Sequence, residues 1–174
     1  TQQHPIPPKG WGAVESLIWD DKITLETLGH EVQIINVGDP MKILGMIDNF
    51  NPDFVHINYD DWVPLYSYIR YPCAITTHFA YIERPELMGP YKQRVFDVFG
   101  QVKPAVFGLS EGINGVYEND CKIPSDRLYL NPNGVMLDNF RVTDTPKFAD
   151  RSIFLAKVDY RKRQCFFQSI DSLW

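Results

Sequence analysis

The stretch Pro7-Pro8-Lys9-Gly10-Trp11-Gly12-Ala13-Val14-Glu15 joins a bare glycine turn to the start of an apolar helical pattern. A helix that begins at such a turn presents free backbone N–H groups and the positive end of its dipole, an arrangement that suits phosphate. The alternative is a tight turn that only leads the chain into the helix. A basic cluster lies far along the chain and comprises Lys157, Arg161, Lys162 and Arg163. We expect the glycine turn and this basic cluster to face each other across a cleft.

Helix and strand patterns alternate regularly along the chain. The expected helices cover residues 12–28, 41–50, 61–69, 86–100, 111–119 and 162–173, and the expected strands cover residues 31–35, 54–57, 73–77, 105–109, 127–130 and 152–156. Strands separated by helices predict right-handed parallel units, and hence an α/β protein with an open, mainly parallel sheet and helices on both faces. Ligands of such sheets bind beyond the carboxyl ends of the strands. The loops of interest are therefore 5–12, 58–62, 78–86 and 110–112.

The patterns divide the chain into three parts. Residues 1–135 form the predicted sheet domain, residues 136–151 are a polar connection, and residues 152–174 start a second domain that we expect to continue past Trp174. We also expect a strand ahead of the glycine turn. The apolar face of the last segment needs a surface to pack on, either the chain's own first domain or a second copy of the chain, which would make a homodimer. This face comprises Ile153, Phe154, Phe166, Phe167 and Ile170.

Composition excludes several classes of protein. The 174 residues are 44% hydrophobic and 22% charged, as in ordinary globular proteins. A net charge of −5 does not favour nucleic acid or anionic lipid as a partner. No apolar run approaches the roughly 20 residues that a membrane helix needs. Three cysteines without metal-ligand spacing, Cys73, Cys121 and Cys165, fit a reducing compartment, so a cytoplasmic location is expected.

Several separate motifs resemble those of a known family. They are Gly10-Trp11-Gly12-Ala13-Val14-Glu15, Leu28-Gly29-His30-Glu31-Val32, Pro52-Asp53-Phe54-Val55-His56, Thr76-Thr77-His78, Ser110-Glu111, Asn131-Pro132-Asn133-Gly134-Val135 and Leu155-Ala156-Lys157-Val158-Asp159-Tyr160-Arg161-Lys162. In this order and spacing the chain resembles the N-terminal half of family-four glycosyltransferases, which have the two-domain GT-B architecture. The resemblance implies a Rossmann-like sheet forming one GT-B half. Ala156, Lys157 and Arg163 depart from the family's usual glycine, arginine and glycine.

The resemblance also implies an activity. Family members transfer a sugar from a nucleotide-diphosphate sugar to an acceptor hydroxyl with retention of configuration, and need no further cofactor. Gly12 would approach the diphosphate together with Gly10, and Lys157 and Lys162 would neutralise it. His78 would contact the donor sugar near the reaction centre. The implied partners are the nucleotide-sugar and a sugar or glycolipid acceptor, the latter allowing peripheral contact with a membrane.

Other residues near the predicted strand ends are weaker candidates. Asp60, beside Asp61, would bind an acceptor hydroxyl or cap the next helix, and capping is the better interpretation for one of the pair. Tyr81 and Glu83 are candidate acceptor or lid residues. Glu111 is expected to stabilise a helix N-terminus. The chain has no Asp-x-Asp motif, so no metal is expected in catalysis.

Two rival functions remain open at the level of sequence. The first is a non-catalytic Rossmann-like module that binds a glycan or a protein partner. The second is a nucleotide-dependent oxidoreductase, whose dinucleotide fingerprint requires a third glycine where this chain has Glu15. That departure counts against the oxidoreductase.

Overall fold

The computed structural model describes residues 4–10, 12–137, 152–153 and 172–173, which belong to two compact units, Thr1–Val135 and Met136–Trp174. The first unit is an α/β domain with an open, all-parallel sheet of four strands. Helices flank this sheet on both sides, so the predicted fold class is confirmed and the unit is Rossmann-like.

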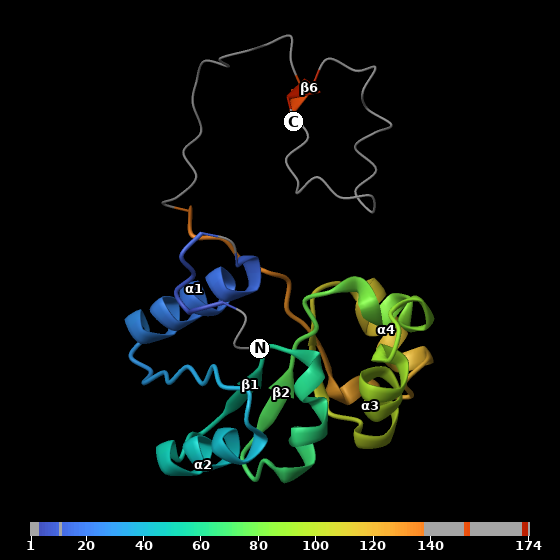
Figure 1. Cartoon of the computed structure of the whole chain (residues 1–174), viewed down its shortest axis with the longest axis horizontal. Coiled ribbons are helices and arrows are strands. Elements are labelled where there is room, and N and C mark those ends of the chain that lie inside the picture. Colours follow the sequence, from blue (N-terminus) through green and yellow to red (C-terminus); the bar gives the residue numbers. More distant parts are fainter. Residues whose placement is uncertain (1–3, 11, 138–151, 154–171, 174) are drawn as a thin grey trace. The chain divides into compact units, whose positions relative to one another are not determined.

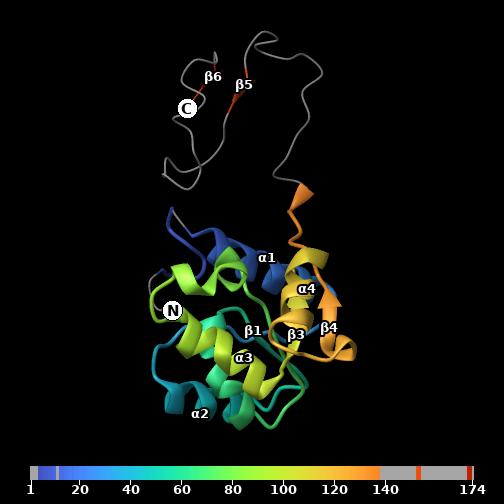
Figure 2. The ribbon, with the colours of Figure 1, turned by 90° about the vertical axis from the view of Figure 1, so that its right-hand side faces the viewer.

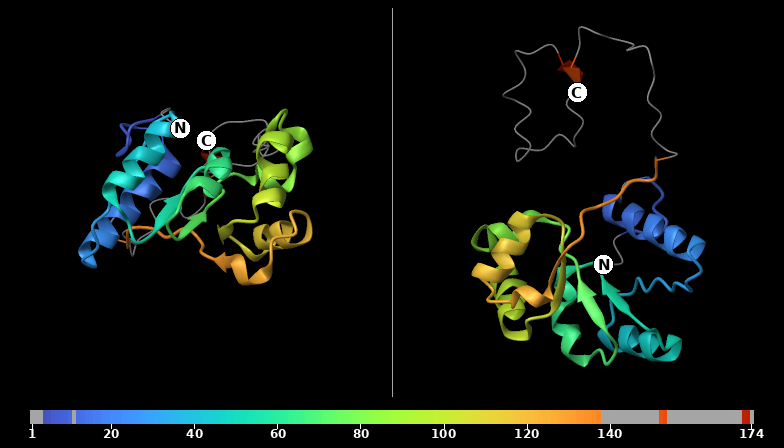
Figure 3. Two further views of the ribbon diagram at one scale, coloured as in Figure 1. Left: turned by 90° about the horizontal axis from the view of Figure 1, so that it is seen from below. Right: turned by 180° about the vertical axis from the view of Figure 1, so that it is seen from behind.

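The four strands stand side by side in sequence order. They are β1 (Val55–Ile57), β2 (Cys73–Ile75), β3 (Ala105–Gly108) and β4 (Leu128–Leu130). Figure 1 shows β1 beside β2, and β3 and β4 are labelled in Figure 2. Figure 3 shows α1 (Ala13–Thr27) and α2 (Pro40–Phe50) on one side of the strands, and α3 (Asp97–Val102) and α4 (Glu111–Asn119) on the other. Helices therefore lie on both sides of the sheet, as the alternation of patterns predicted.

Shorter helical turns connect these elements. They are the 3₁₀ helices η1 (Asp60–Tyr68), η2 (Ala80–Glu83), η3 (Pro85–Leu87) and η5 (Ser125–Arg127) and the π-helical turn η4 (Lys92–Phe96).

The core lies between β2, β3 and the helices on the α3 side. All of β2 is buried, as expected for a strand covered on both faces. Phe99 of α3 and Tyr117 of α4 are fully buried and meet with ring centroids 5.0 Å apart. This cluster holds the carboxyl ends of β2 and β3 in place.

Local sequence explains where α2 and α4 begin. The Asp39 carboxylate accepts the N–H groups of Met41 and Lys42, and Pro40 occupies the first helical turn, where no N–H is required. The Ser110 hydroxyl accepts the N–H of Ile113 at the start of α4. Both helices therefore begin close to their predicted first residues.

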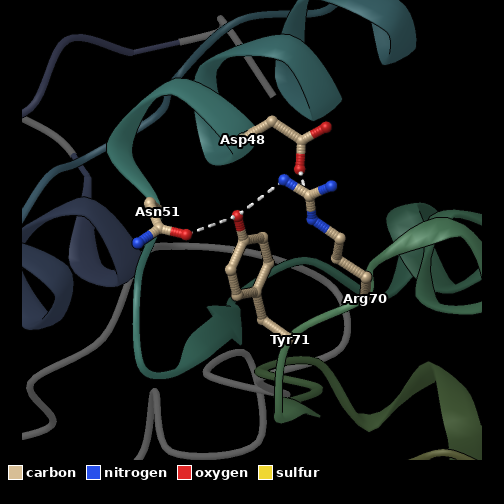
Figure 4. A network of polar contacts seen from close by, with 4 residues as sticks. All are labelled: Asp48, Asn51, Arg70 and Tyr71. Carbon is tan, nitrogen blue, oxygen red and sulfur yellow. Dashed lines mark hydrogen bonds and ion pairs between the residues drawn. The ribbon is translucent and has the colours of Figure 1, made fainter.

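A polar network joins the end of α2 to the segment that leads into β2 (Figure 4). The Arg70 guanidinium forms an ion pair with Asp48 at 3.3 Å and donates to the Tyr71 hydroxyl at 3.2 Å. Tyr71 in turn donates to Asn51 at 3.2 Å. The network lies before β1 and β2 begin and hence at the amino ends of these strands, away from the edge where ligands are expected.

Two expected elements differ from the prediction. Residues 31–35 form no strand, since no described strand lies beside them to pair with. The helix expected over 86–100 is broken: η3 ends at Leu87, and regular α-helix resumes only at Asp97. Gly89, with φ of 56°, and the following Pro90 explain the break, because neither favours continuing a helix.

The second unit is described at residues 136–137, 152–153 and 172–173. Ser152–Ile153 (β5) pairs in parallel with Ser172–Leu173 (β6). The strand expected over 152–156 is thus present at its first two residues, whereas the end of the helix expected over 162–173 is a strand, because it pairs with β5. Residues 154–171 lie outside the described residues, as do Lys157 and Lys162.

Candidate functional site

A group of residues from three separate segments meets at the carboxyl ends of β1 and β2. We call Gly12, Glu15, Asn58, Tyr59 and His78 the carboxyl-edge cluster. Gly12 and Glu15 stand at the start of α1, Asn58 and Tyr59 follow β1, and His78 follows β2 after two buried threonines. Parallel strands end at one edge of a sheet, which is why these loops converge.

Gly12 has a backbone conformation that suits glycine alone. Its φ is 147°, and a Cβ placed there would lie 2.9 Å from the Pro8 Cβ and 3.0 Å from Glu15 Oε2. Its carbonyl accepts both the N–H and the hydroxyl of Ser16, at 2.8 and 2.9 Å. The glycine turn is therefore packed closely against the first turn of α1.

Glu15 ties the start of α1 to the end of β1. Its side chain is buried, at 5% exposure, and accepts the Tyr59 hydroxyl at 2.6 Å. A carboxylate in the first turn of a helix is stabilised by the helix dipole. Glu15 also lies close enough to His78 to raise its pKa, so the glycine turn and the histidine lie at the same edge of the sheet.

His78 has one ring nitrogen engaged and one without a partner. Nε2 lies 3.1 Å from Asn58 Oδ1, whereas Nδ1 is buried without a hydrogen-bond partner. Burial lowers the pKa of His78, and the nearby Glu15 carboxylate partly offsets that effect. A neutral imidazole with an unsatisfied nitrogen is available for a hydrogen bond to a ligand.

His56 lies deeper on the same pair of strands. Its Nε2 lies 2.8 Å from the Thr76 hydroxyl, and its ring packs edge-on against Phe107. Burial, reinforced by the positive charge on a protonated His78, lowers the pKa of His56 to about 4. His56 is thus a neutral histidine held within the structure.

The glycine turn borders an open hollow of about 360 Å³ at the start of α1. Gly10, Gly12, Ala13 and Ser16 line it. A volume of this order accommodates a small phosphate-bearing group. Lys157 and Lys162 lie outside the described residues. That these lysines and the glycine turn bind one diphosphate from opposite sides therefore stays a prediction.

The Asp60 side chain is buried and hydrogen-bonded inside the domain. It is 5% exposed and accepts the Tyr91 hydroxyl, and burial raises its pKa. The N-cap of η1 is Tyr59, so neither Asp60 nor Asp61 caps that helix, and the capping interpretation is wrong. The chain enters η1 one residue earlier than predicted, and Asp61 instead lies on the surface, 3.4 Å from Arg94.

Tyr81 and Glu83 lie on η2, directly after His78. The Tyr81 ring stacks on Phe79 with centroids 5.2 Å apart and meets Tyr91 edge-on at 5.7 Å. Phe79 is 40% exposed, so the stacked pair offers an aromatic surface to solvent. Glu83 is exposed at the end of η2, and Glu111 lies in the first turn of α4, which Ser110 caps.

Sequence reasoning missed Glu15, Asn58 and Tyr59 as site residues. A local signal existed for each, since Asn58 and Tyr59 follow a strand directly and Glu15 stands in the first turn after the glycines. The contact between Tyr59 and Glu15 joins residues 44 positions apart, and only the folded sheet brings them together.

Within the described ranges, no three histidine, cysteine, aspartate or glutamate side chains converge to hold a metal ion. None of the helices described is both long and apolar enough to cross a bilayer. In comparisons with known proteins, no family model, no curated protein and no solved structure matches the chain.

Proposed function

We propose that the chain carries the acceptor-side half of a glycosyltransferase that uses a nucleotide-diphosphate sugar. The observation that supports this most is the buried, unpartnered Nδ1 of His78 in the same cluster as the Gly12 turn. A glycine turn at a helix N-terminus suits a phosphate, and an imidazole nearby suits a sugar hydroxyl. The resemblance to family-four glycosyltransferases supplies the chemical class.

In the proposed reaction the bond between the sugar's anomeric carbon and the diphosphate breaks, and an acceptor hydroxyl forms the new bond with retention of configuration. Negative charge develops on the departing nucleoside diphosphate. Backbone N–H groups at Gly12 and the ammonium groups of Lys157 and Lys162 would stabilise that charge. His78 would orient the donor sugar through Nδ1, while its Nε2 is held by Asn58.

Glu15 limits where the diphosphate can lie. Its buried carboxylate stands against Gly12 on the Tyr59 side, and two anions at one point repel each other. The phosphates would therefore occupy the hollow on the Ser16 side of the turn. The sugar would extend toward His78.

A second candidate is a non-catalytic module that binds a glycan. The stacked Phe79–Tyr81 pair favours it, because an exposed aromatic face at a ligand-binding edge suits the apolar face of a sugar ring. Such a module would bind a glycan without consuming a nucleotide-sugar.

Release of nucleoside diphosphate from UDP-, GDP- and ADP-glucose, with and without simple sugar acceptors, separates the two candidates. The glycosyltransferase predicts turnover with one donor, reduced at least tenfold in His78→Ala and unchanged in His30→Ala, a matched change at an exposed histidine. Glycan binding without turnover of any donor would contradict the proposal and favour the binding module.

A further inference from the structure

Two asparagine–glycine pairs occur in the sequence, Asn114-Gly115 and Asn133-Gly134. Such a pair is chemically reactive, because the glycine nitrogen can attack the asparagine side-chain amide and no Cβ on the glycine hinders that attack. Whether the reaction proceeds in a folded protein depends on the backbone freedom of the pair and on its access to water. The two pairs of this chain differ in both respects.

Asn133 and Gly134 lie in the irregular segment that follows β4. Residues 131–136 have no regular secondary structure, and both members of the pair are exposed. A Cβ placed on Gly134 would meet no atom within 4 Å, so the glycine faces open space. Among the described residues, none is hydrogen-bonded to the Asn133 side chain or to the Gly134 N–H. The backbone of this pair is therefore free to bring the nitrogen against the amide carbon.

The constrained part of this segment ends just ahead of the pair. Asn131 donates its N–H to the Gly108 carbonyl at 2.8 Å, which extends the pairing of β4 with β3 by one residue. Pro132 follows and has no N–H with which to continue the ladder. The pair thus begins where the sheet stops holding the backbone, at a position of low local stability.

Asn114 and Gly115 lie inside α4 and are constrained by the helix. In an α-helix each N–H donates to the carbonyl four residues back, which engages the Gly115 nitrogen. The helix also keeps ψ at about −42°, which directs that nitrogen away from the side-chain amide carbon of the preceding residue. The Asn114 Oδ1 atom is buried against Gly108, where a Cβ would collide with it. The fold therefore blocks ring closure at this pair.

We propose that Asn133 is a site of spontaneous deamidation, and that the fold confines the reaction to this pair by protecting Asn114. The Gly134 nitrogen attacks Cγ of Asn133, the bond from Cγ to Nδ2 breaks, and the amide nitrogen leaves as ammonia with the proton of the Gly134 N–H. The product is a five-membered succinimide ring. Water then opens the ring at Cγ to give aspartate, or at the main-chain carbonyl to give isoaspartate.

Both products change the charge of the segment, and one changes its backbone. Either product adds one negative charge to a chain whose net charge is −5. Isoaspartate also routes the main chain through the former side-chain carbon, which adds one methylene group to the backbone. The change falls three residues past Leu130, the end of β4, at the carboxyl edge of the sheet where ligands are expected.

Peptide mass spectrometry of the whole chain during incubation tests the proposal. Samples held in mildly alkaline buffer are digested briefly with trypsin, and peptides 128–141 and 95–122 are fragmented by a method that distinguishes isoaspartate from aspartate. We expect Asn133 to gain about one dalton at least tenfold faster than Asn114, with isoaspartate among its products. In the chain unfolded in urea the two pairs should react at similar rates, because the helix no longer protects Asn114.

Two alanine substitutions provide matched controls. Gly134→Ala places a methyl group beside the attacking nitrogen and should slow the conversion of Asn133 at least tenfold, and the methyl group meets no atom within 4 Å that would disturb the fold. Gly115→Ala, at the helical pair, should leave the rate at Asn133 unchanged. Equal rates at the two pairs in the folded chain, or a rate at Asn133 that Gly134→Ala leaves unaltered, would overturn the proposal.

Discussion

At the scale of single residues, two histidines near β1 and β2 have different surroundings: His56 belongs to β1, and His78 follows β2. His56 bonds Thr76, and His78 bonds Asn58, so each pair links β1 to β2. Both imidazoles are held in the neutral form by burial, yet only Nδ1 of His78 is buried without a partner. The difference fits a structural role for His56 and, under the proposed function, ligand contact for His78.

The buried His56 makes stability depend on pH. Its pKa falls from 6.5 to about 4 on folding, so below pH 6.5 the unfolded chain binds a proton that the folded chain does not. The free energy of unfolding should therefore fall as the pH drops from about 6.5 to 4, by on the order of 3 kcal/mol from this residue. Urea unfolding across that range measures the slope.

His56→Gln keeps a polar partner for Thr76 and should flatten this slope, while His30→Gln, at an exposed position, should not. Equal slopes in His56→Gln and the unsubstituted protein would contradict the assignment. A smaller contribution of the same sign is expected from His78, whose pKa is also lowered.

The buried pair of Asp60 and Tyr91 gives a second prediction at this scale. Tyr91→Phe leaves the Asp60 carboxylate buried without its hydroxyl donor, so we expect a loss of about 1–3 kcal/mol in the free energy of unfolding. Tyr68→Phe removes a hydroxyl from a side chain 74% exposed and should change stability little. Equal losses in the two variants, measured by urea unfolding, would argue against a structural role for this bond.

At the scale of elements, local chemistry decided what the sequence could predict. Helix α2 begins at Pro40, directly after its N-cap Asp39, and α4 begins directly after its N-cap Ser110, so both starts are recognisable from the sequence. A strand also requires a neighbouring strand to pair with, and local sequence does not identify that neighbour. Residues 31–35 accordingly have the sequence pattern of a strand but pair with none of the described strands. The expected helix over 86–100 was wrong at its start because Gly89-Pro90 interrupts an otherwise suitable pattern.

The glycine turn supports a prediction about an element's start. Gly12→Ala forces a Cβ against Pro8 at a φ of 147°, and we expect it to reduce the free energy of unfolding by about 1–3 kcal/mol. Gly45→Ala, inside α2 with no atom within 4 Å of the added carbon, should raise it by about 0.5–1 kcal/mol. Chemical denaturation of both variants tests the pair. Stabilisation by both would mean that the turn is not constrained as described.

At the scale of the whole molecule, the order of the predicted elements was enough to place the candidate site at one edge of the sheet, but not to predict its internal contacts. Gly12 and His78 were predicted as site residues because each follows a predicted strand or precedes a predicted helix, and their binding role stays a prediction. Glu15 and Tyr59 were missed because their bond depends on how α1 lies over β1. Asp60 was expected to face a ligand or cap a helix, yet η1 turns its side chain inward to Tyr91.

The central claim is that the glycine turn and His78 bind one nucleotide-sugar. The most direct test is NMR of the four histidine side chains, assigned by single His→Gln variants, during titration with UDP-, GDP- and ADP-glucose. One donor should shift the His78 resonance saturably and leave His30 unmoved, with affinity at least tenfold weaker in Gly12→Ala. A His78 resonance that stays fixed with all three donors, or a shift that Gly12→Ala leaves unweakened, would contradict the account.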